Sequence, residues 1–409
     1  MNRLNLFHNQ ICNKNNNNIN NNNIKNKSES VIISAIRSPM TKAKKGELSK
    51  IPTEIILSQL MNYLIKKTQI NPSLIDDIII GNVLQGGCGF INSRVAQKLS
   101  GIPENVPLYS INRLCNSGLQ AIINANEIIK NGGNKIVIAG GIEKMSNGEF
   151  KNMLNPNLID KNIFENEKKT IENIFIPMGN TNENICKKFN ISREEQDKFA
   201  YNSHMKAISA EKNSFFSQEI LPIKYNNIIV SKDDIRKNID LNALKKLPPV
   251  FDKNGTTTAG NSSPLTDGCA LVLMTTREIA EKYNCEILGK IIDYSVVGVP
   301  SEIMGIGPAI AIPSVLKSSG LNLSEIDLFE INEAFAGQAL YCIKTLGIPE
   351  NKVNVHGGAI ALGHPLGCTG GRLVVSLLNE LKIYNKKRGI VSMCVGTGMG
   401  AACIIERDD

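Results

Sequence analysis

Short apolar runs alternate with amphipathic stretches along most of the chain from Val31 onward. The apolar runs are rich in valine and isoleucine and predict strands at 31–37, 77–84 and 135–143. The stretches between them repeat apolar residues at helical spacing and predict helices at 53–67 and 91–100. Strands that alternate with helices form βαβ units, in which helices cover both faces of the sheet. The pattern therefore predicts an α/β protein.

A second series of strand and helix patterns repeats the first. INPSLIDDIIIGN at 70–82 resembles LNLSEIDLFEIN at 321–332, and DGCALVLM at 267–274 resembles MGAACIIE at 399–406. The first two segments each follow an apolar helix pattern, and the other two each open on small residues before a strand. These pairs predict a duplicated α/β unit whose first copy carries a long insertion, with a chance likeness between strands as the alternative.

The segment that interrupts the first copy has a different composition. It is rich in asparagine, lysine and glutamate and contains isolated helix patterns such as SREEQDKFAYNSHMKAISAEKN. A long insertion of this kind predicts a surface subdomain that covers a ligand site. We therefore expect a leader at 1–30, a first half made of 31–145 and 266–287, an inserted loop domain at 146–265 that binds the ligand, and a second half at 288–409.

The first 28 residues contain no acidic residue and two runs of four asparagines. They lack the apolar mass that would offset the entropy of ordering, which predicts disorder. Arg3-Leu4 and Gln10-Ile11, separated by five residues, resemble the nonapeptide that an import receptor reads to bring proteins into peroxisomes. A mitochondrial transit peptide, favoured by the basic composition, and a random asparagine-rich extension are the alternatives.

Composition excludes several other classes of protein. The 409 residues are 42% hydrophobic and 21% charged, and no apolar run approaches the ~20 residues of a membrane span. The basic residues behind the net charge of +8 are scattered, which favours a cleft for a phosphate-bearing ligand at least as much as a nucleic-acid surface. Ten cysteines without a C-x-x-C pair, and only four histidines, predict reduced thiols and no metal site.

Cys115 lies between a short apolar strand pattern and an amphipathic helix, in INRLCNSGLQAIINANEII. Asn116 or Ser117 can cap this helix, and the free N–H groups of its first turn would then lower the cysteine pKa by about one or two units. Gly118 would let a substrate approach the backbone. From these residues alone, a reactive thiol and a buried structural cysteine are about equally supported.

Three further motifs place reactive groups beside predicted strand ends or helix starts. VHGGAIALGHPLGCTGGR carries His364 between glycine and proline, a loop position that favours a general base or donor, whereas His356 is more typical of a structural role. VSMCVGTGMGAA brings Cys394 to a strand end, where Gly396 leaves its N–H group exposed. EINEAFAGQA ends its strand at Asn332, which can orient a water or donate to an oxyanion. Because α/β sheets place sites at the carboxyl ends of their strands, we expect these groups to converge with Cys115.

Together these motifs resemble the thiolase family over essentially the whole chain after the leader. The segments that carry the resemblance, in the family's order, are NRLCNSGLQA, AGGIEKMS, IPMGNTNENI, TTTAGNSSPLTDG, VVGVPSEIMGIGP, EINEAFAGQA, GGAIALGHPLGCTGGR and SMCVGTGMGAA. SGLQA, MGNTNEN and GVPSEIMGIGP are more similar to peroxisomal 3-ketoacyl-CoA thiolases than to biosynthetic acetoacetyl-CoA thiolases. Leu114 and Asn116 replace the more usual Gln and Ser beside the nucleophile, which leaves the acyl-chain preference open.

The resemblance implies the thiolase fold, in which two βαβαβαββ halves stack as a five-layer αβαβα sandwich with an inserted loop domain, assembled as a homodimer or homotetramer. It implies thiolytic cleavage of 3-ketoacyl-CoA to acetyl-CoA and a shortened acyl-CoA, the last step of fatty-acid β-oxidation, in the peroxisome. Condensation of two acetyl-CoA molecules is the alternative. Coenzyme A is then a substrate, and no metal or other cofactor is implied.

The resemblance also implies roles for individual residues. Cys115 would accept the acyl group after activation by His364, and Cys394 would be the general acid and base. His364, with a water held on Asn332, would stabilise the enolate oxygen, while the backbone N–H groups of Cys115 and Gly396 would form a second oxyanion hole. The residues that would line the coenzyme A groove are Met178, Ala259, Ser263, Ala334 and Phe335.

Three other readings remain beside this one. A ketoacyl or chalcone-type synthase shares the fold and the cysteine nucleophile, but it uses a histidine or asparagine in place of the second cysteine. A sterol-carrier-type thiolase would differ in the GHPLG motif. A non-enzymatic binding module would have lost the reactive groups, so the presence of Cys115, Asn332, His364 and Cys394 together disfavours it.

Overall fold

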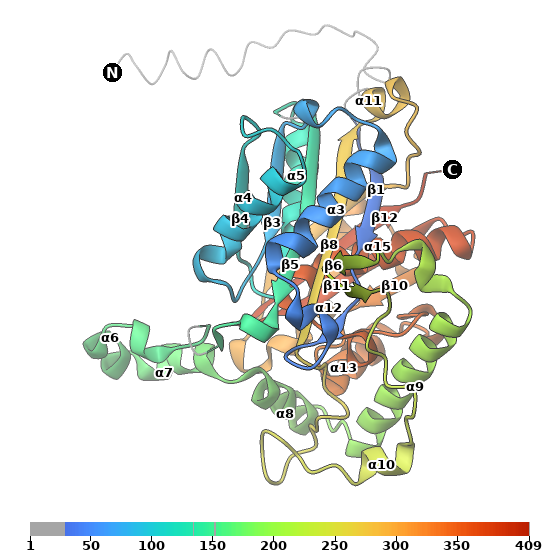
Figure 1. Cartoon of the computed structure of the whole chain (residues 1–409). Helices are drawn as coiled ribbons and strands as arrows, with labels where there is room; N and C mark the ends of the chain where they lie inside the picture. The colour runs from blue at the N-terminus through green and yellow to red at the C-terminus, as the bar shows by residue number, and fades with distance from the viewer. Residues whose placement is uncertain (1–28, 134, 151–152, 409) are drawn as a thin grey trace, which may run out of the picture.

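Two β-sheets and three layers of helices make up the body of the protein (Figure 1). The computed structural model describes residues 29–133, 135–150 and 153–408. In the first sheet the strand order is β1 (Ser30–Arg37), β8 (Thr266–Thr276), β5 (Ile136–Lys144), β3 (Asp77–Gly81) and β4 (Leu108–Ile111), with β2 (Thr41–Lys42) paired to β8. In the second sheet it is β10 (Leu328–Ile331), β11 (Arg388–Val395), β12 (Met399–Glu406) and β9 (Lys290–Gly298).

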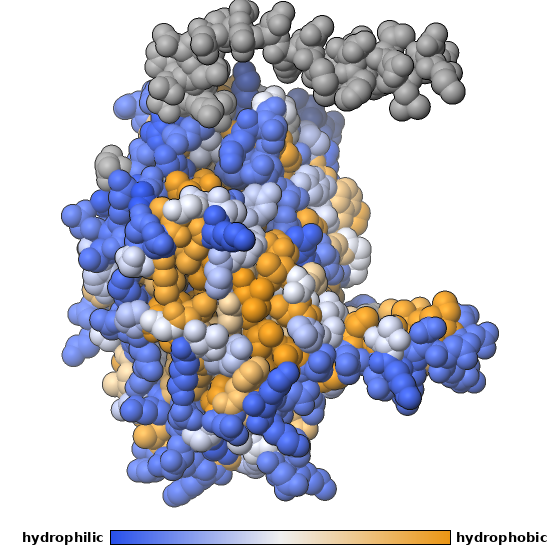
Figure 2. Space-filling model, turned by 180° about the vertical axis from the view of Figure 1, so that it is seen from behind, coloured by the Kyte–Doolittle hydropathy of each residue, from blue (hydrophilic) through white to orange (hydrophobic). Residues whose placement is uncertain are grey.

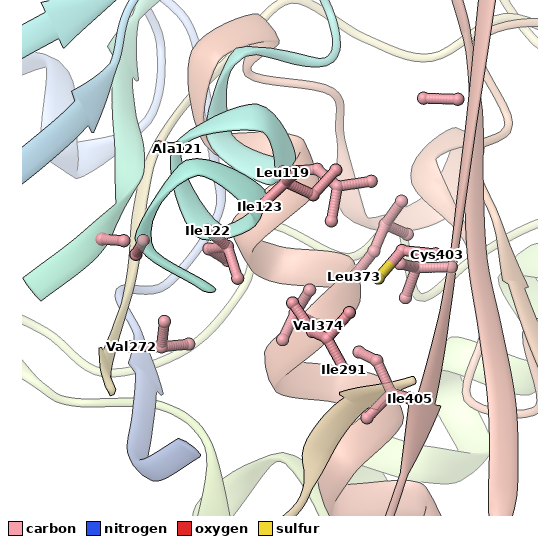
Figure 3. Close-up of a cluster of buried hydrophobic side chains, with 14 of the residues drawn as sticks. Leu119, Ala121, Ile122, Ile123, Val272, Ile291, Leu373, Val374, Cys403 and Ile405 are labelled. Atoms are coloured by element: carbon pink, nitrogen blue, oxygen red, sulfur yellow. The ribbon is translucent and has the colours of Figure 1, made fainter. Parts of the chain in front are cut away.

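Helices α5 (Ser117–Lys130) and α15 (Leu366–Ile383) form the central layer between the two sheets. Their apolar side chains, among them Leu119 and Leu373, pack with Val272 of the first sheet and Cys403 of the second in one buried cluster (Figure 3). Helices α3 (Thr53–Thr68) and α4 (Phe90–Leu99) cover the outer face of the first sheet, and α12 (Gly307–Ser319) and α13 (Ala336–Leu346) that of the second. The layers thus follow the order helix, sheet, helix, sheet, helix.

The two sheets repeat one pattern of strand pairing, which confirms the predicted duplication. Gly81 pairs with Gly141 where β3 lies parallel to β5, and Ile331 pairs with Ser392 where β10 lies parallel to β11. Beyond these pairs, β8 lies antiparallel to β5 and β12 lies antiparallel to β11. The segments that matched in sequence therefore occupy the same places in the two sheets.

Most predicted elements lie within a residue or two of the observed ones, but the first parallel strand ends early. The sequence predicts a strand over 77–84, whereas β3 ends at Gly81. The N–H groups of Val83 and Leu84 donate to the carboxylate of Glu143 at 2.9 and 3.1 Å, and not to a neighbouring strand. Here a carboxylate side chain accepts the hydrogen bonds that a neighbouring strand would otherwise accept, and hydrophobic pattern alone cannot reveal this.

The chain between β5 and β8 adds helices and one hairpin to the outside of the body. It contains α6 (Lys161–Asn166), α7 (Lys168–Ile171), α8 (Met178–Lys188), α9 (Arg193–Lys212), α10 (Leu241–Lys245) and the hairpin of β6 (Ile223–Tyr225) and β7 (Ile228–Val230). Helices α6 and α7 project as an arm with apolar residues along it (Figures 1 and 2), among them Ile163 at 54% exposure. Helices α8 and α9 lie against α13, and α9 also lies against α14 (Ala359–Leu362).

The last helix outside these layers, α11 (Arg277–Lys282), follows β8 and contacts β1 and β8. In the part of the chain that the structure describes, no helix combines the length and apolar character of a membrane span. The nine cysteines described are free thiols, as predicted. Residues 1–28 of the predicted leader, with the proposed peroxisomal nonapeptide, lie outside the described residues, whereas Ser30 at the end of that prediction belongs to β1.

Candidate active site

A tight loop before α5 presents Cys115. Leu114 adopts a left-handed backbone with φ of 47°, which reverses the chain between β4 and the helix. The hydroxyl of Ser117 accepts a hydrogen bond from the N–H of Arg113 at 2.8 Å and donates to the carbonyl of Leu114 at 2.6 Å. Ser117 therefore stabilises the loop, and Asn116 makes no side-chain cap. The predicted capping of α5 by either residue was wrong.

The sequence had suggested that Gly118 gives a substrate access to the backbone. In the structure Gly118 instead serves the packing of two helices. A Cβ atom at this position would lie 2.6 Å from the carbonyl oxygen of Gly367 and 3.1 Å from the nitrogen of Gly371. Only glycine lets the first turns of α5 and α15 approach this closely. The contact brings the loop that carries Cys115 beside the loop that carries His364.

The Cys115 thiol is buried, at 8% exposure, and faces backbone N–H groups. Burial raises its pKa to about 11, although hydrogen bonds from the N–H groups of Gly396 and of Cys115 itself favour the thiolate. The expected lowering of this pKa was therefore wrong in direction, because removal of water from the thiolate outweighs the nearby donors. At neutral pH the sulfur keeps its proton, so attack on a carbonyl requires a base.

Cys394 lies at the end of β11, fully buried, in a cluster with Met304, Ala334 and Phe335. Burial raises its pKa well above the ordinary value, and the nearby sulfur of Cys115 raises it further. The two predicted reactive sulfurs thus share one buried site, although they come from different halves of the chain.

His364 and Asn332 lie side by side, both nearly inaccessible to solvent. The Asn332 amide nitrogen is 3.4 Å from Nε2 and 3.5 Å from Nδ1 of the ring, and among the described residues its Oδ1 accepts no hydrogen bond. Nδ1 of His364 lies 2.6 Å from the hydroxyl oxygen of Thr369. Burial, and then the positive charge of Arg372, lower the His364 pKa to about 3. The imidazole is therefore neutral at pH 7 and can accept a proton.

Four of the five residues predicted to line the coenzyme A groove lie on the Cys394 side of the site. Met178 packs against the cluster that contains Ala334, Phe335 and Cys394, and its sulfur lies 3.3 Å from the place where a Cβ on Gly396 would be. Both the N–H and the hydroxyl of Ser263 donate to the carbonyl of Ala334 at 3.0 Å. These contacts form one continuous wall on the Cys394 side of the site.

Ala259, the fifth predicted groove residue, lines a separate shallow depression of about 40 Å³. Lys42, His204 and Arg236 face the same depression, together with the carboxylate of Asp234. This is a candidate place for the phosphate groups of a ligand, as the net positive charge suggested.

A further hollow, of about 240 Å³, lies beside Leu114, the residue before Cys115. Apolar and polar residues both line it, among them Val83, Leu84, Met153, Gln85, Asn112 and Glu149.

His356 packs away from these groups, as its structural reading predicts. Its ring stacks on Phe215 with centroids 4.6 Å apart, and its Nε2 lies 3.1 Å from the hydroxyl of Tyr384. Burial lowers its pKa to about 4. Among the described residues, no group of three or more histidine, cysteine, aspartate or glutamate side chains is arranged to hold a metal ion.

Sequence reasoning missed two residues that shape the site, Glu143 and Thr369. Glu143 accepts hydrogen bonds from the N–H groups of Val83, Leu84 and Gly367, and so ties the end of β3 to the start of α15. Its contacts join distant segments and leave no local signal. Thr369 had one signal, because it lies four residues after Pro365, and a threonine hydroxyl in the first turn of a helix can bond back to the carbonyl four residues earlier.

Comparison with known proteins gives a consistent family assignment. The family model described as "Thiolase, N-terminal domain" matches residues 30–278, and "Thiolase, C-terminal domain" matches residues 285–407. The chain is 47% identical over 390 residues to peroxisomal 3-ketoacyl-CoA thiolase B of Rattus norvegicus, covering 93% of this chain and 91% of the relative. It is 46% identical to the peroxisomal 3-ketoacyl-CoA thiolase of Homo sapiens over the same shares of the two chains.

Solved structures agree with the sequence comparison. The dimeric peroxisomal thiolase of Saccharomyces cerevisiae superposes with a TM-score of 0.88 at 45% identity, covering 93% of this chain and 98% of that one. The acetyl-CoA acetyltransferase of Bacillus anthracis superposes with a TM-score of 0.85 at 37% identity, covering 94% and 100%. The predicted fold, with its duplicated halves and five layers, is therefore confirmed, and the chain belongs to the thiolase family.

Proposed function

We propose that the protein is a 3-ketoacyl-CoA thiolase, which uses coenzyme A to cleave 3-ketoacyl-CoA into acetyl-CoA and an acyl-CoA shortened by two carbons. The observation that carries the proposal is the proximity of the buried Cys115 and Cys394. It is supported by the buried pair of His364 and Asn332, whose neighbouring residues contact those of the two cysteines. The high identity to relatives with this name supports the same substrate class over acetoacetyl-CoA alone.

In the first half-reaction, His364 takes the proton of the Cys115 thiol and the sulfur attacks the 3-keto carbon. The alkoxide that forms would accept hydrogen bonds from the backbone N–H groups of Cys115 and Gly396. The bond between carbons 2 and 3 then breaks, and its electron pair becomes the enolate of acetyl-CoA. The thiol of Cys394 donates its proton to carbon 2, which releases acetyl-CoA and leaves an acyl group on Cys115.

Asn332 and His364 are the groups best placed to stabilise the enolate oxygen. Oδ1 of Asn332, which accepts no hydrogen bond among the described residues, can hold a water that donates to the oxygen beside the His364 ring. Donors that are fixed in a water-poor site cost no reorganisation when the charge develops. Removal of one such donor typically slows a reaction by on the order of 100- to 1,000-fold.

In the second half-reaction, the Cys394 thiolate takes the proton of an incoming coenzyme A thiol. The coenzyme A sulfur attacks the acyl carbon on Cys115, and the Cys115 sulfur leaves and recovers its proton from His364. The shortened acyl-CoA departs and all three groups return to their starting state. The depression beside Ala259, with Lys42 and Arg236, would receive phosphates of the coenzyme.

The central test is the variant Cys115→Ala, with acyl-enzyme formation followed by mass spectrometry. We expect loss of both the acyl adduct and thiolysis in a protein with an unchanged melting temperature. Activity within about tenfold of the wild type would contradict the mechanism. Thiolysis rates across acyl lengths test the substrate class, since comparable rates only at four carbons would favour an acetoacetyl-CoA thiolase.

We also propose a homodimer, as in the dimeric yeast structure. Among the described strands β4 pairs only with β3, and the neighbouring helix α4 exposes Ile91, Val95 and Leu99 at every fourth position, at 70%, 41% and 54% exposure. An apolar stripe beside an open sheet edge suits a second copy of the chain. Sedimentation of Val95→Glu against the wild type tests this surface and separates a dimer from a tetramer.

The compartment we propose is the peroxisome, which is part of the names of the relatives. Residues 1–11 would carry the import signal, as the sequence predicts. Microscopy of the full chain and of a chain without residues 1–11 would decide. Loss of peroxisomal import on deletion supports the signal, and mitochondrial import of the full chain would overturn it.

A further inference from the structure

Thr369 holds the ring of His364 through a short hydrogen bond. It is fully buried in the first turn of α15, five residues after the histidine, and its hydroxyl oxygen lies 2.6 Å from Nδ1 of the ring. The same oxygen lies 2.9 Å from the carbonyl oxygen of Pro365. One hydroxyl thus faces both a ring nitrogen and a carbonyl.

The position of the carbonyl decides the direction of both hydrogen bonds. A carbonyl oxygen only accepts, and a hydroxyl carries a single proton. Two oxygens at 2.9 Å with no proton between them would repel, so the Thr369 proton points to Pro365. The hydroxyl oxygen is then left as an acceptor toward Nδ1, which must carry the ring proton.

We propose that Thr369 is a positioning residue that fixes the neutral His364 ring in the form with its proton on Nδ1. Nε2 then keeps its lone pair and is ready to receive the proton of the Cys115 thiol. This inference rests on the proposed function, in which His364 is the base. Without the hydroxyl, the proton could move to Nε2 and a large part of the enzyme would hold its base in the wrong form.

The other neighbours of the ring do not determine which of its nitrogens carries the proton. The Asn332 amide nitrogen lies nearly equally far from the two ring nitrogens, at 3.4 and 3.5 Å, so it does not distinguish them. Arg372 acts on His364 through its charge, and its own guanidinium donates to Glu330. Among the described contacts of the ring, only the Thr369 hydroxyl is specific for Nδ1.

The test compares Thr369→Val, which keeps the shape and loses the hydroxyl, with Thr369→Ser, which keeps the hydroxyl. Thr275→Val on β8 is the matched control, because Thr275 is equally buried and its hydroxyl has no partner among the described residues. We expect kcat for thiolysis, and the rate of Cys115 alkylation by iodoacetamide, to fall roughly 10- to 100-fold in Thr369→Val. Thr369→Ser and Thr275→Val should stay within about threefold of the wild type.

A second readout does not depend on activity. Nitrogen-15 NMR of histidine-labelled wild-type protein reports which ring nitrogen carries the proton, and His364→Asn assigns the signal among the four histidines of the chain. We expect the Nδ1–H form in the wild type and in Thr369→Ser, and a shift toward the Nε2–H form in Thr369→Val.

Three results would overturn the inference: an Nε2–H ring in the wild type, full activity in Thr369→Val, or equal loss in Thr369→Ser and Thr369→Val. A failure of the proposed function would look different. In that case the ring tautomer and the Cys115 alkylation rate would still change in Thr369→Val, but neither the wild type nor any variant would cleave 3-ketoacyl-CoA.

Discussion

The two halves of the molecule place different residues at the same points of the same sheet pattern. Gly81 of the first half corresponds to Ile331 of the second, and the next residues are Asn82 and Asn332. Gly141 corresponds to Ser392, and the residues two positions later are Glu143 and Cys394. The residues named second belong to the C-terminal half. Because the two sheets share one architecture, a difference between corresponding positions reflects what the side chains do and not where they lie.

The first half uses its strand-end groups to hold backbone. The Asn82 amide donates to the carbonyl of Ile142 at 2.8 Å and accepts from the N–H of Gln85 at 3.2 Å, while Glu143 accepts three backbone N–H groups. In the second half, Oδ1 of Asn332 accepts no hydrogen bond among the described residues. The first copy thus uses these positions to hold backbone, and in the mechanism we propose the second copy uses them for chemistry.

The largest effect that would test this comparison is expected from Cys394→Ser. Serine is a much weaker acid than a thiol, so both half-reactions lose their proton donor and acceptor, and we expect each to slow by on the order of 100- to 10,000-fold. Single-turnover acylation and deacylation, measured separately, check this. A normal rate in either step would show that Cys394 does not act in both.

The two asparagines should respond in opposite ways to removal of the amide. Asn332→Ala should lower kcat by on the order of 100- to 1,000-fold with little change in the melting temperature. Asn82→Ala should lower the free energy of unfolding by about 1–3 kcal/mol, because a buried carbonyl loses its donor, with kcat within about tenfold. Measurements of kcat and of thermal unfolding for both variants test this difference. Equal losses of kcat in the two variants would contradict it.

Glu143→Gln separates a structural carboxylate from a catalytic one. The glutamine oxygen can still accept hydrogen bonds, but its NH₂ group would face the backbone N–H of Leu84, or those of Val83 and Gly367 in the other orientation. We therefore expect a loss of about 1–3 kcal/mol in the free energy of unfolding. Glu127→Gln on the more exposed side of α5 is the control, with a change below about 0.5 kcal/mol. A 100-fold loss of kcat at unchanged stability would place Glu143 in the chemistry.

The two central helices also differ, in the charged side chains that they bury. A substitution that tests this difference gives the smallest predicted effect. Helix α5 buries no charged side chain, whereas α15 buries Arg372 and Glu380. Burial raises the pKa of Glu380 well above its ordinary value, and the charges of Glu330 and Glu219 raise it further. A carboxyl with a raised folded-state pKa destabilises the protein as pH rises above about 4.5, where only the unfolded chain releases its proton.

Glu380→Gln should therefore be more stable than the wild type at pH 8, by at least about 1 kcal/mol, and the gap should close as pH falls toward 4.5. Glu286→Gln is the matched control, because Glu286 is 53% exposed in its pair with Lys382 and should show almost no pH-dependent gap. Chemical unfolding at several pH values provides the measurement. A gap that is constant with pH would mean that Glu380 is ionised in the folded protein.

The sequence by itself determined the fold class and the duplication, and it singled out the candidate reactive residues. Strand and helix periods are local, so hydrophobic pattern reveals β1 and α3 nearly to the residue. Cys115, His364, Cys394 and Asn332 could be singled out because each lies at a strand end or helix start, where α/β sheets place their sites.

Only the tertiary structure decided how those groups behave. The Cys115 pKa is raised and not lowered, because the desolvation of a thiolate depends on every layer packed around it and not on the helix that follows it. Gly118 meets α15, Glu143 reaches three distant N–H groups, and Thr369 orients a ring. Burial and long-range hydrogen bonds arise from segments that are far apart in the chain, so no local pattern encodes them.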